Sequence, residues 1–352
     1  MRVLFAGTPE VAVPSLQALL ASSHEVAAVL TRADAKAGRG NKLTPSPVRV
    51  AAEAAGIPVI TGNTSDAGVQ AEIAALGCEA AAVVAYGHLL RQSALDLMPK
   101  GWFNLHFSLL PRWRGAAPLQ WALISGDNEV GVSVFQLDPG MDTGPVFATE
   151  VVPLHGADSE HSETAGTLLP RLADVGAGLL VKVFDDVAAG TAVGVPQTGE
   201  PTLAPKITAE LARVDWDRPA LEIYQQIQGV TPNPGAWTTL LTDDDAEPIR
   251  LNLALPAPPE LSQSNVLSHE IAREVGSSPS VERSRENTRE VETPVVQGYL
   301  PPGQLRVEKK AVWVGTGSQP LRLTIVQPPG KKPMPATDWV RGARLTPDSK
   351  LE

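Results

Sequence analysis

The 352-residue sequence predicts two domains: an α/β domain with a Rossmann-like, mostly parallel sheet, and a smaller C-terminal, OB-like β-barrel. Over the first 190 residues, short β-branched runs alternate with alanine-rich helical stretches, which is typical of a parallel sheet covered by helices on both faces. Beyond residue 205, short apolar runs separated by turn residues indicate an all-β unit. The chain is also longer than the ~250 residues at which single cores stop growing.

The expected strands of the first domain are short, and the run over 80–85 is apolar on both faces, so we place it centrally. Ligands of such sheets bind at the carboxyl ends of the strands, which makes the segments after residues 6, 30, 85, 106 and 137 candidates for a functional site. The expected strands are Val3–Ala6, Glu25–Leu30, Pro58–Ile60, Ala80–Ala85, Trp102–His106 and Val130–Leu137. The expected helices are Pro14–Ser22, Val48–Ala55, Ala67–Leu76, Ala116–Ile124 and Thr164–Ala188.

A cluster of prolines after residue 200 marks the end of the alternating strand and helix pattern. We therefore predict a first domain over 1–190, a linker over 191–206 and a second domain over 207–352. Within the second domain, 257–297 is rich in Ser, Glu, Arg and Pro and has no aromatic residue, so we expect a mobile insertion there. The strands of this domain are expected at Ala236–Leu241, Ile249–Leu255, Gln304–Val307, Ala311–Val314 and Leu321–Val326.

Composition excludes several classes of protein. The single cysteine, Cys78, rules out a disulfide framework and a zinc-thiolate cluster and fits a reducing cytosol. No apolar run approaches the ~18 residues that span a bilayer, and no signal peptide is visible, so we expect a soluble cytoplasmic protein without a membrane partner. The net charge of −10 is unevenly distributed: residues 1–50 carry +3, residues 300–352 carry +5, and the middle carries −18.

The most informative stretch begins at Asn104 and His106. Residues two apart on a strand point to one face, so both side chains should project together near the end of a strand. Two such donors make an oxyanion site of the kind that acyl-type transfer needs. The alternative is structural: Asn104 caps a turn and His106 is a hydrogen-bonded core histidine.

A second candidate is Asp142, in the glycine-rich turn 138–145 that follows the next expected strand. A carboxylate there can accept a hydrogen bond from His106, favour the imidazolium and fix its ring. Asp-Thr-Gly is also common turn chemistry, so the alternative interpretation of Asp142 is purely local.

These residues resemble the 10-formyltetrahydrofolate-dependent formyltransferases, which have a formyltransferase fold. The resemblance rests on Asn104, His106, SLLPRWRGAAP at 108–118 and MDTG at 141–144. It is strongest to members that act on methionyl-tRNA, and it covers about 1–256 and 298–345. Supporting segments are FAGTPEVAVPSL at 5–16, AGRGNKLTPSPV at 37–48, VVAYGHLL at 83–90 and TPNPGAWT at 231–238. The chain departs from the family in the insertion 257–297 and in Phe107, which replaces an often smaller residue.

The resemblance implies a mechanism. The α-amino group of methionine on initiator methionyl-tRNA would attack the formyl carbon on N10 of 10-formyltetrahydrofolate. His106 and Asn104 would stabilise the tetrahedral oxyanion, and Asp142 would orient and charge His106. No enzyme nucleophile and no metal are required. The implied folate contacts are Ser108, Leu109, Leu110, Pro111, Val84, Tyr86, Gly87 and Leu89.

The resemblance also assigns the basic residues to tRNA. Arg39 and Lys42 lie in the glycine-rich loop 31–47, and Arg112 and Arg114 flank Trp113 in a turn. In the second domain, Lys309, Lys310, Lys331 and Lys332 supply another basic surface, as small barrels that bind nucleic acid commonly do. For each of these groups, the alternative interpretation is an ordinary solvated surface that does not bind RNA. The acidic run 155–163, with two histidines, is expected to be a solvated turn and not a metal site. We expect a monomer.

Other functions stay open at this stage. They are a formyltransferase acting on a small amine such as an amino sugar or glycinamide ribotide, a 10-formyltetrahydrofolate hydrolase, a nucleotide-dependent oxidoreductase, and a silent RNA-binding module. The oxidoreductase is disfavoured because no G-x-G-x-x-G fingerprint stands at a β-α turn. The 31–47 loop and the basic second domain favour tRNA over a small amine.

Overall fold

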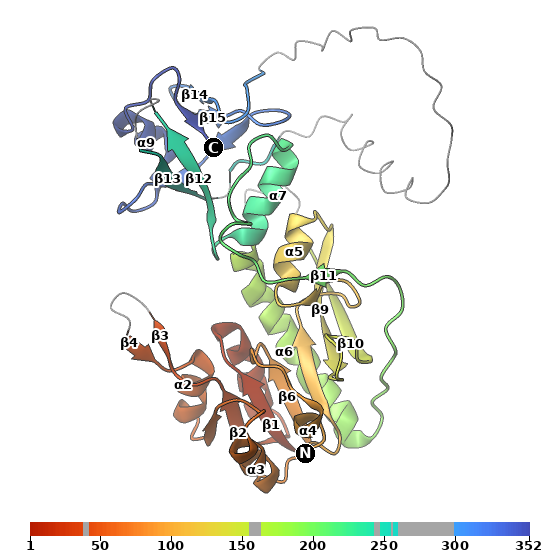
Figure 1. The fold of residues 1–352 in the computed structure, drawn as a ribbon. Coiled ribbons are helices and arrows are strands. Elements are labelled where there is room, and N and C mark those ends of the chain that lie inside the picture. Colours follow the sequence, from red (N-terminus) through yellow and green to blue (C-terminus); the bar gives the residue numbers. More distant parts are fainter. Residues whose placement is uncertain (38–41, 155–162, 243–246, 255, 260–298) are drawn as a thin grey trace, which may run out of the picture. The chain divides into compact units, whose positions relative to one another are not determined.

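A computed structural model of the chain describes residues 1–37, 42–154, 163–242, 247–254, 256–259 and 299–352 (Figure 1). These residues form two compact units. The first unit comprises 1–209 with 228–234, and the second comprises 210–227 with 235–352. Helix α7 (Ala220–Val230) contributes residues to both units.

The first unit is built on a seven-stranded sheet in the order β10-β9-β7-β6-β1-β2-β5. The five strands from β7 to β5 are parallel, whereas β9 and β10 are antiparallel to their neighbours. This confirms the mostly parallel α/β fold. The strands are β1 (Arg2–Gly7), β2 (Glu25–Thr31), β5 (Val59–Thr61), β6 (Ala80–Val84), β7 (Trp102–His106), β9 (Glu129–Gln136) and β10 (Val146–Pro153).

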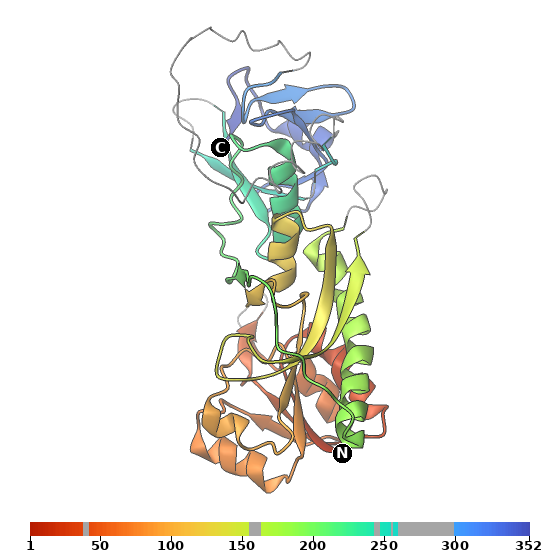
Figure 2. The ribbon, with the colours of Figure 1, turned by 90° about the vertical axis from the view of Figure 1, so that its right-hand side faces the viewer.

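Helices cover both faces of this sheet. On one face, α1 (Val13–Leu20), α2 (Pro47–Ala54), α5 (Pro118–Ile124) and α6 (Ala165–Ala189) share a core with Phe103 and Leu105. On the other face, α3 (Ala67–Ala75) and α4 (Gln92–Leu95) pack with Trp102. Figure 2 shows the long helix α6 lying along β9 and β10.

Local sequence explains the best-defined elements. All five residues of β6 are buried, which suits the central strand of a sheet covered on both faces. Helix α6 begins after Thr164, whose side chain accepts from the backbone of Thr167 while Thr167 bonds back, a capping box. The helix ends at Gly190, which adopts the left-handed conformation (φ 73°) that glycine tolerates.

The structure also contains elements that the sequence did not predict. They include the edge strand β10, the short helix α4, helix α7 and two pairs of very short strands, together with the elements over 334–335, 336–342 and 350–351 in the second unit. Strands β3 (Ala35–Ala37) and β4 (Lys42–Thr44) form a hairpin within the loop predicted over 31–47. Strand β8 (Arg114–Gly115) pairs in parallel with β11 (Leu203–Ala204), inside the segment predicted as a linker. Residues 191–206 therefore pack against the rest of the first unit.

The second unit consists of antiparallel strands in two sheets. The predicted strand 321–326 divides at Thr324, because its two halves belong to different sheets. One sheet has the order β18 (Met334–Pro335), β17 (Ile325–Gln327), β13 (Ile249–Leu253), β12 (Ala236–Leu241) and β19 (Lys350–Leu351). The other has β14 (Leu305–Val307), β15 (Val312–Val314) and β16 (Leu321–Leu323), and helix α9 spans Ala336–Gly342. Most of the predicted insertion 257–297 lies outside the described residues.

Across the described ranges, no helix is long and apolar enough to cross a membrane.

Candidate active site

His106, the last residue of β7, is 5% exposed and has one ring nitrogen committed to the main chain. Its Nε2 lies 2.9 Å from the carbonyl oxygen of Trp113, which can only accept, so Nε2 carries a proton. The other nitrogen, Nδ1, faces the carboxylate of Asp142 at 3.8 Å. Burial lowers the pKa of His106 below 6.5, while Asp142 and the Trp113 carbonyl oppose that shift. The ring is therefore neutral at neutral pH, and Nδ1 can take up a proton. Its one N–H is engaged by Trp113, so the resting ring is neither charged by Asp142 nor free to donate to an oxyanion, as the resemblance implied.

Asp142 is held from two sides. Its Oδ2 accepts a hydrogen bond from the backbone N–H of Gly115 at 2.8 Å, and its own carbonyl accepts from Gln197 at 2.8 Å. Its backbone has φ 54°, a left-handed conformation that is uncommon for residues other than glycine. The 3.8 Å separation from His106 is longer than a hydrogen bond. In this structure the Trp113 carbonyl thus orients the ring, which we had predicted for Asp142, and Asp142 acts on it through charge.

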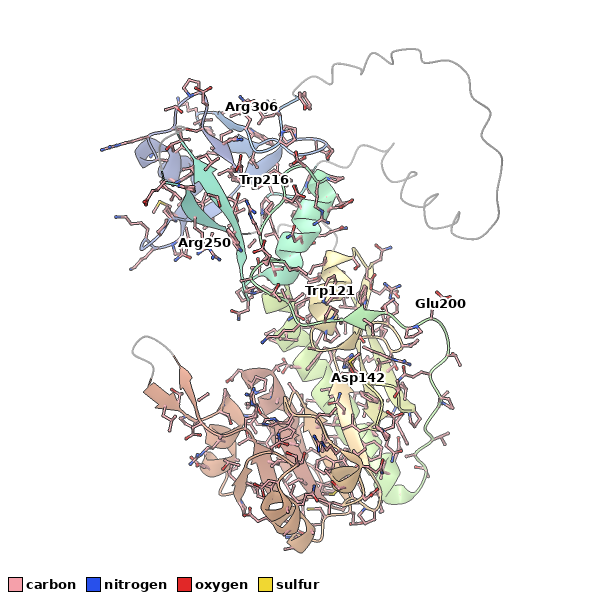
Figure 3. The ribbon with its side chains drawn as sticks, in the orientation of Figure 1. Trp121, Asp142, Glu200, Trp216, Arg250 and Arg306 are labelled. Atoms are coloured by element: carbon pink, nitrogen blue, oxygen red, sulfur yellow. The ribbon has the colours of Figure 1, made fainter. Side chains whose placement is uncertain are left out.

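Asp142 reaches this site by a route that differs from the prediction. We expected the segment after residue 137 to leave the sheet beside the carboxyl end of β7. Because β9 is antiparallel to β7, Leu137 instead lies at the opposite end, where its N–H donates to the carbonyl of Trp102. The loop 138–145 must then return along the sheet to bring Asp142, which is labelled in Figure 3, to His106.

Asn104 lies on β7 two residues before His106 and is half-buried. The alternation of the strand puts both side chains on the same face as Trp102, the face covered by α3 and α4. A cavity of about 320 Å³ lies on this side, between residues 92–102 and 136–139. It lies at the amino end of β7, the end opposite His106, and none of Asn104, His106 and Asp142 lines it.

The run after β7 is folded tightly against β9. The Ser108 hydroxyl donates to the Arg112 carbonyl at 2.6 Å, and the Ser108 carbonyl accepts from Ser133 at 2.7 Å. The N–H of Leu110 donates to the same Ser133 hydroxyl at 3.2 Å. Ser108 is buried, whereas Leu109, Leu110 and Pro111 are half-buried. The three apolar residues therefore offer the accessible surface of this run, and the Ser108 side chain stabilises its turn.

The other predicted folate residues lie at the end of β6 and in the loop after it, beside the topological switch between β1 and β6. Val84 and Tyr86 are buried, and Gly87 and Leu89 are exposed, Leu89 to 76%. The Tyr86 carbonyl accepts from the Thr8 hydroxyl at 2.9 Å, which joins the loops after the two strands. The Tyr86 phenol donates to Gly62 at 2.6 Å, and burial raises its pKa to about 12, so the phenol stays neutral and acts as an internal brace.

The predicted tRNA contacts have different surroundings. The guanidinium of Arg112 pairs with Asp127 and lies over the Trp113 ring, and it is half exposed. The guanidinium of Arg114 donates to Gln197. Lys309 and Lys310 lie at the turn between β14 and β15, Lys331 and Lys332 lie between β17 and β18, and all four are exposed. Arg39 and the Lys42 side chain lie outside what the structure describes, as does most of the acidic run 155–163.

Three groups that hold the site were not predicted. Two are main-chain atoms, the Trp113 carbonyl on His106 and the Gly115 N–H on Asp142. The third is the side chain of Gln197. No residue pattern identifies a main-chain contact in advance, and a glutamine in a proline-rich segment carries no chemical signature. Among the described residues, no group of three or more His, Cys, Asp or Glu side chains is placed to hold a metal ion.

Two family models match the chain, one in each of its two parts. Residues 1–184 match the family described as formyl transferase, and residues 206–344 match the formyl transferase C-terminal domain. The methionyl-tRNA formyltransferase of Clavibacter michiganensis is 48% identical over 342 residues, which cover 97% of each chain. That of Streptomyces coelicolor is 45% identical over 354 residues, which cover 100% of this chain and 99% of its own.

Solved structures show the same fold. A methionyl-tRNA formyltransferase from Clostridium thermocellum aligns with a TM-score of 0.51 and 16% identity over 74% of this chain and 95% of its own. A HypX variant from Aquifex aeolicus aligns with a TM-score of 0.58 and 16% identity over 98% of this chain, which spans about half (49%) of the HypX chain. Together with the near full-length sequence matches, these results show that the chain belongs to the formyl transferase family, among the methionyl-tRNA formyltransferases.

Proposed function

We propose that this chain transfers the formyl group of 10-formyltetrahydrofolate to the α-amino group of methionine on initiator methionyl-tRNA. The observation that carries the chemistry is the approach of Asp142 to a buried, neutral His106 on the strand that also bears Asn104. The near full-length likeness to methionyl-tRNA formyltransferases supports the choice of acceptor. We further propose that the chain works as a monomer in the cytoplasm.

The reaction begins when the neutral amine attacks the formyl carbon and forms a C–N bond. Negative charge then develops on the formyl oxygen, where the Asn104 amide supplies a donor. His106 Nδ1 takes the proton that the attacking nitrogen loses, and Asp142 stabilises the resulting imidazolium. When the bond from carbon to N10 breaks, that proton passes to N10. The proton count closes without an enzyme nucleophile, and His106 returns to its neutral form.

The substrates are assigned to separate surfaces. The folate is assigned to the half-buried Leu109 and Leu110, which follow the carboxyl end of β7, and to the segment 84–89 at the carboxyl end of β6. The tRNA is assigned to the basic residues of the 31–47 loop and of the second unit, with the exposed lysines at 309–310 and 331–332 contacting phosphates.

A transfer assay tests this function. The full chain is combined with 10-formyltetrahydrofolate and with charged initiator or elongator tRNA, and formylmethionine and free formate are measured together. We expect formylmethionine on the initiator tRNA. Release of formate alone would identify a hydrolase, and formylation of an amino sugar or glycinamide ribotide in place of tRNA would identify a small-amine enzyme. Either result contradicts the proposal.

Variants test the assigned roles. Removal of one oxyanion donor commonly costs ~10²–10³ in rate, and a positioned general base contributes ~10²–10⁴. We therefore expect Asn104→Ala, His106→Ala and Asp142→Asn each to lower kcat by at least about 10² while the melting temperature stays near wild type. Asp174→Asn, an exposed substitution on α6, is the matched control for Asp142→Asn. A wild-type kcat in the His106 or Asp142 variant contradicts the mechanism.

A further inference from the structure

The segment 190–202 joins α6 to β11 (Figure 1) and carries Gln197, whose side-chain amide forms hydrogen bonds through both its nitrogen and its oxygen. Nε2 donates to the carbonyl oxygens of Asp142 and Gly144, each at 2.8 Å. Oε1 accepts from Nε and Nη2 of Arg114, at 3.1 and 2.7 Å. The amide orientation is fixed by this arrangement, because a carbonyl cannot donate and a guanidinium cannot accept.

These contacts act on the conformation of Asp142. The left-handed backbone at Asp142 is one that residues other than glycine seldom adopt, so it depends on its surroundings. By bonding the carbonyls of residues 142 and 144 with one nitrogen, Gln197 holds the turn that sends the Asp142 carboxylate toward His106.

The two hydrogen bonds from Gln197 to the carbonyls of Asp142 and Gly144 form a clamp on this turn. Arg114 links the clamp to the main-chain groups that hold His106 and the Asp142 carboxylate. Its neighbour Trp113 accepts the hydrogen bond of His106, and its other neighbour, Gly115, donates to the Asp142 carboxylate. The run 113–115 thus holds the carboxylate of Asp142, and Gln197 holds its carbonyl. Arg114 joins these two supports, because it belongs to the run and donates to Gln197.

We propose that Gln197 is a positioning residue of the transfer reaction, which holds Asp142 against His106, and that Arg114 fixes the orientation of its amide. Neither side chain is assigned a contact with the reacting atoms. The inference rests on the proposed function, since it names how the same site is held in its working geometry.

The segment that carries Gln197 has other anchors, so a variant should fold. Val195 and Val146 exchange two backbone hydrogen bonds of 2.8 Å. Beyond Gln197, the Thr202 hydroxyl accepts from the N–H of Trp113 at 2.8 Å. Trp121 donates to the carbonyl of Pro205 at 2.7 Å (Figure 3). Substitution of Gln197 therefore removes the clamp while the segment stays fastened on both sides.

The test compares Gln197→Met with Gln197→Glu. Methionine keeps the length and loses every hydrogen bond, whereas glutamate keeps the acceptors for Arg114 and cannot donate to the two carbonyls. We expect both to lower kcat by about 10–100-fold, the usual cost of removing a group that orients an active residue. KM for each substrate should change less than about threefold. Gln17→Met, at an exposed glutamine of α1, is the matched control and should leave kcat unchanged.

Two further readouts separate positioning from a general loss of structure. If Gln197 acts through Asp142, then Gln197→Met should lower kcat much less in the Asp142→Asn background than in the wild type. It should also move the NMR titration midpoint of the His106 ring to lower pH, the direction that we expect for Asp142→Asn. A wild-type kcat in Gln197→Met, or full additivity with Asp142→Asn, overturns the inference.

Arg114→Met provides a second variant if Gln197→Met fails to fold. A lower kcat at unchanged KM for tRNA supports positioning, whereas a higher KM for tRNA at unchanged kcat makes Arg114 an RNA contact and overturns its part here. Should the wild-type chain transfer no formyl group, the proposed function fails. The His106 titration then still tests the clamp, because it needs no substrate.

Discussion

At the scale of single residues, the chemistry depends on which nitrogen of His106 is available. Nε2 is engaged by the Trp113 carbonyl, so the exchangeable position is Nδ1, on the side of Asp142. Burial keeps the ring neutral, and the nearby carboxylate makes the charged form accessible during the reaction. A histidine that begins neutral and becomes charged suits a step in which an amine must lose a proton.

The charge of Asp142 predicts the direction in which the pKa of His106 changes when Asp142 is replaced. The carboxylate raises the pKa of His106 against the lowering by burial, so its removal in Asp142→Asn should lower that pKa further. The titration midpoint of the His106 ring, followed by NMR, should therefore move to lower pH, with Asp174→Asn as the unaffected control. An unchanged or higher midpoint would show that Asp142 does not act on the ring through charge.

Sequence reasoning pointed to the side chains that we propose take part in the reaction, but not to the groups that hold them. Asn104 and His106 were predictable together because a strand places alternate residues on one face. The residue type of Asp142 suggested a role, yet its route to His106 depends on the direction of β9, which a strand pattern does not reveal. Gln197 was missed because its contacts depend on the return of residues 191–206 to the first unit.

At the scale of elements, helix α6 lies very close to β7. A Cβ added at Gly176 would come within 2.7 Å of the Leu105 side chain, whereas a Cβ at the exposed Gly178 would have no heavy atom within 4 Å. Alanine at Gly178 therefore tests helix propensity alone, whereas alanine at Gly176 tests propensity together with packing against Leu105. Because His106 follows Leu105 on β7, this contact also bears on the placement of the site.

We expect Gly178→Ala to raise the free energy of unfolding by up to about 1 kcal/mol through helix propensity. Gly176→Ala has the same gain in propensity but must displace Leu105, so it should be less stable than Gly178→Ala by about 1–3 kcal/mol. Urea unfolding of both variants measures the difference. Equal stabilities would mean that the space over Leu105 is not restrictive.

Elements with a strong pattern were predictable, and those stabilised only by their neighbours were not. The expected strand over 102–106 has the observed bounds, and the central strand and α6 differ by one residue at their ends. Strand β10 was missed because it lies at the sheet edge and most of its residues are half-buried or exposed, which gives no apolar run. Strands β8 and β11 have two residues each, too few to show any period.

At the scale of the whole molecule, the net charge of −10 conceals two basic ends. Exposed phosphate contacts weaken as salt rises, since binding releases counterions from the nucleic acid. An increase in NaCl from about 50 to about 300 mM should raise the KM for tRNA by at least about tenfold and that for the folate by less than about threefold. Steady-state kinetics with each substrate varied in turn measures this difference.

A variant that lacks one of the lysine pairs shows whether the salt dependence comes from these residues. Replacement of Lys309 and Lys310 by glutamine should reduce the slope of log KM for tRNA against log salt by about 1 for each phosphate that these lysines neutralise in the wild type. An equal salt response for both substrates, or an unchanged slope in this variant, would contradict the assignment of tRNA to the basic ends.

The placement of His106 and Asp142 by the Trp113 carbonyl and the Gly115 N–H has a consequence for how the site is dissected. Neither group is removed by changing a side chain, so an alanine scan would leave both anchors in place wherever the backbone keeps its path and would not show what they contribute. At Gly115 the backbone has little freedom to move, because φ is 129° and a Cβ would come within 2.7 Å of the Ala204 carbonyl oxygen. The informative substitution there is chemical: an ester in place of the Gly115 amide deletes a single donor and leaves every side chain in place.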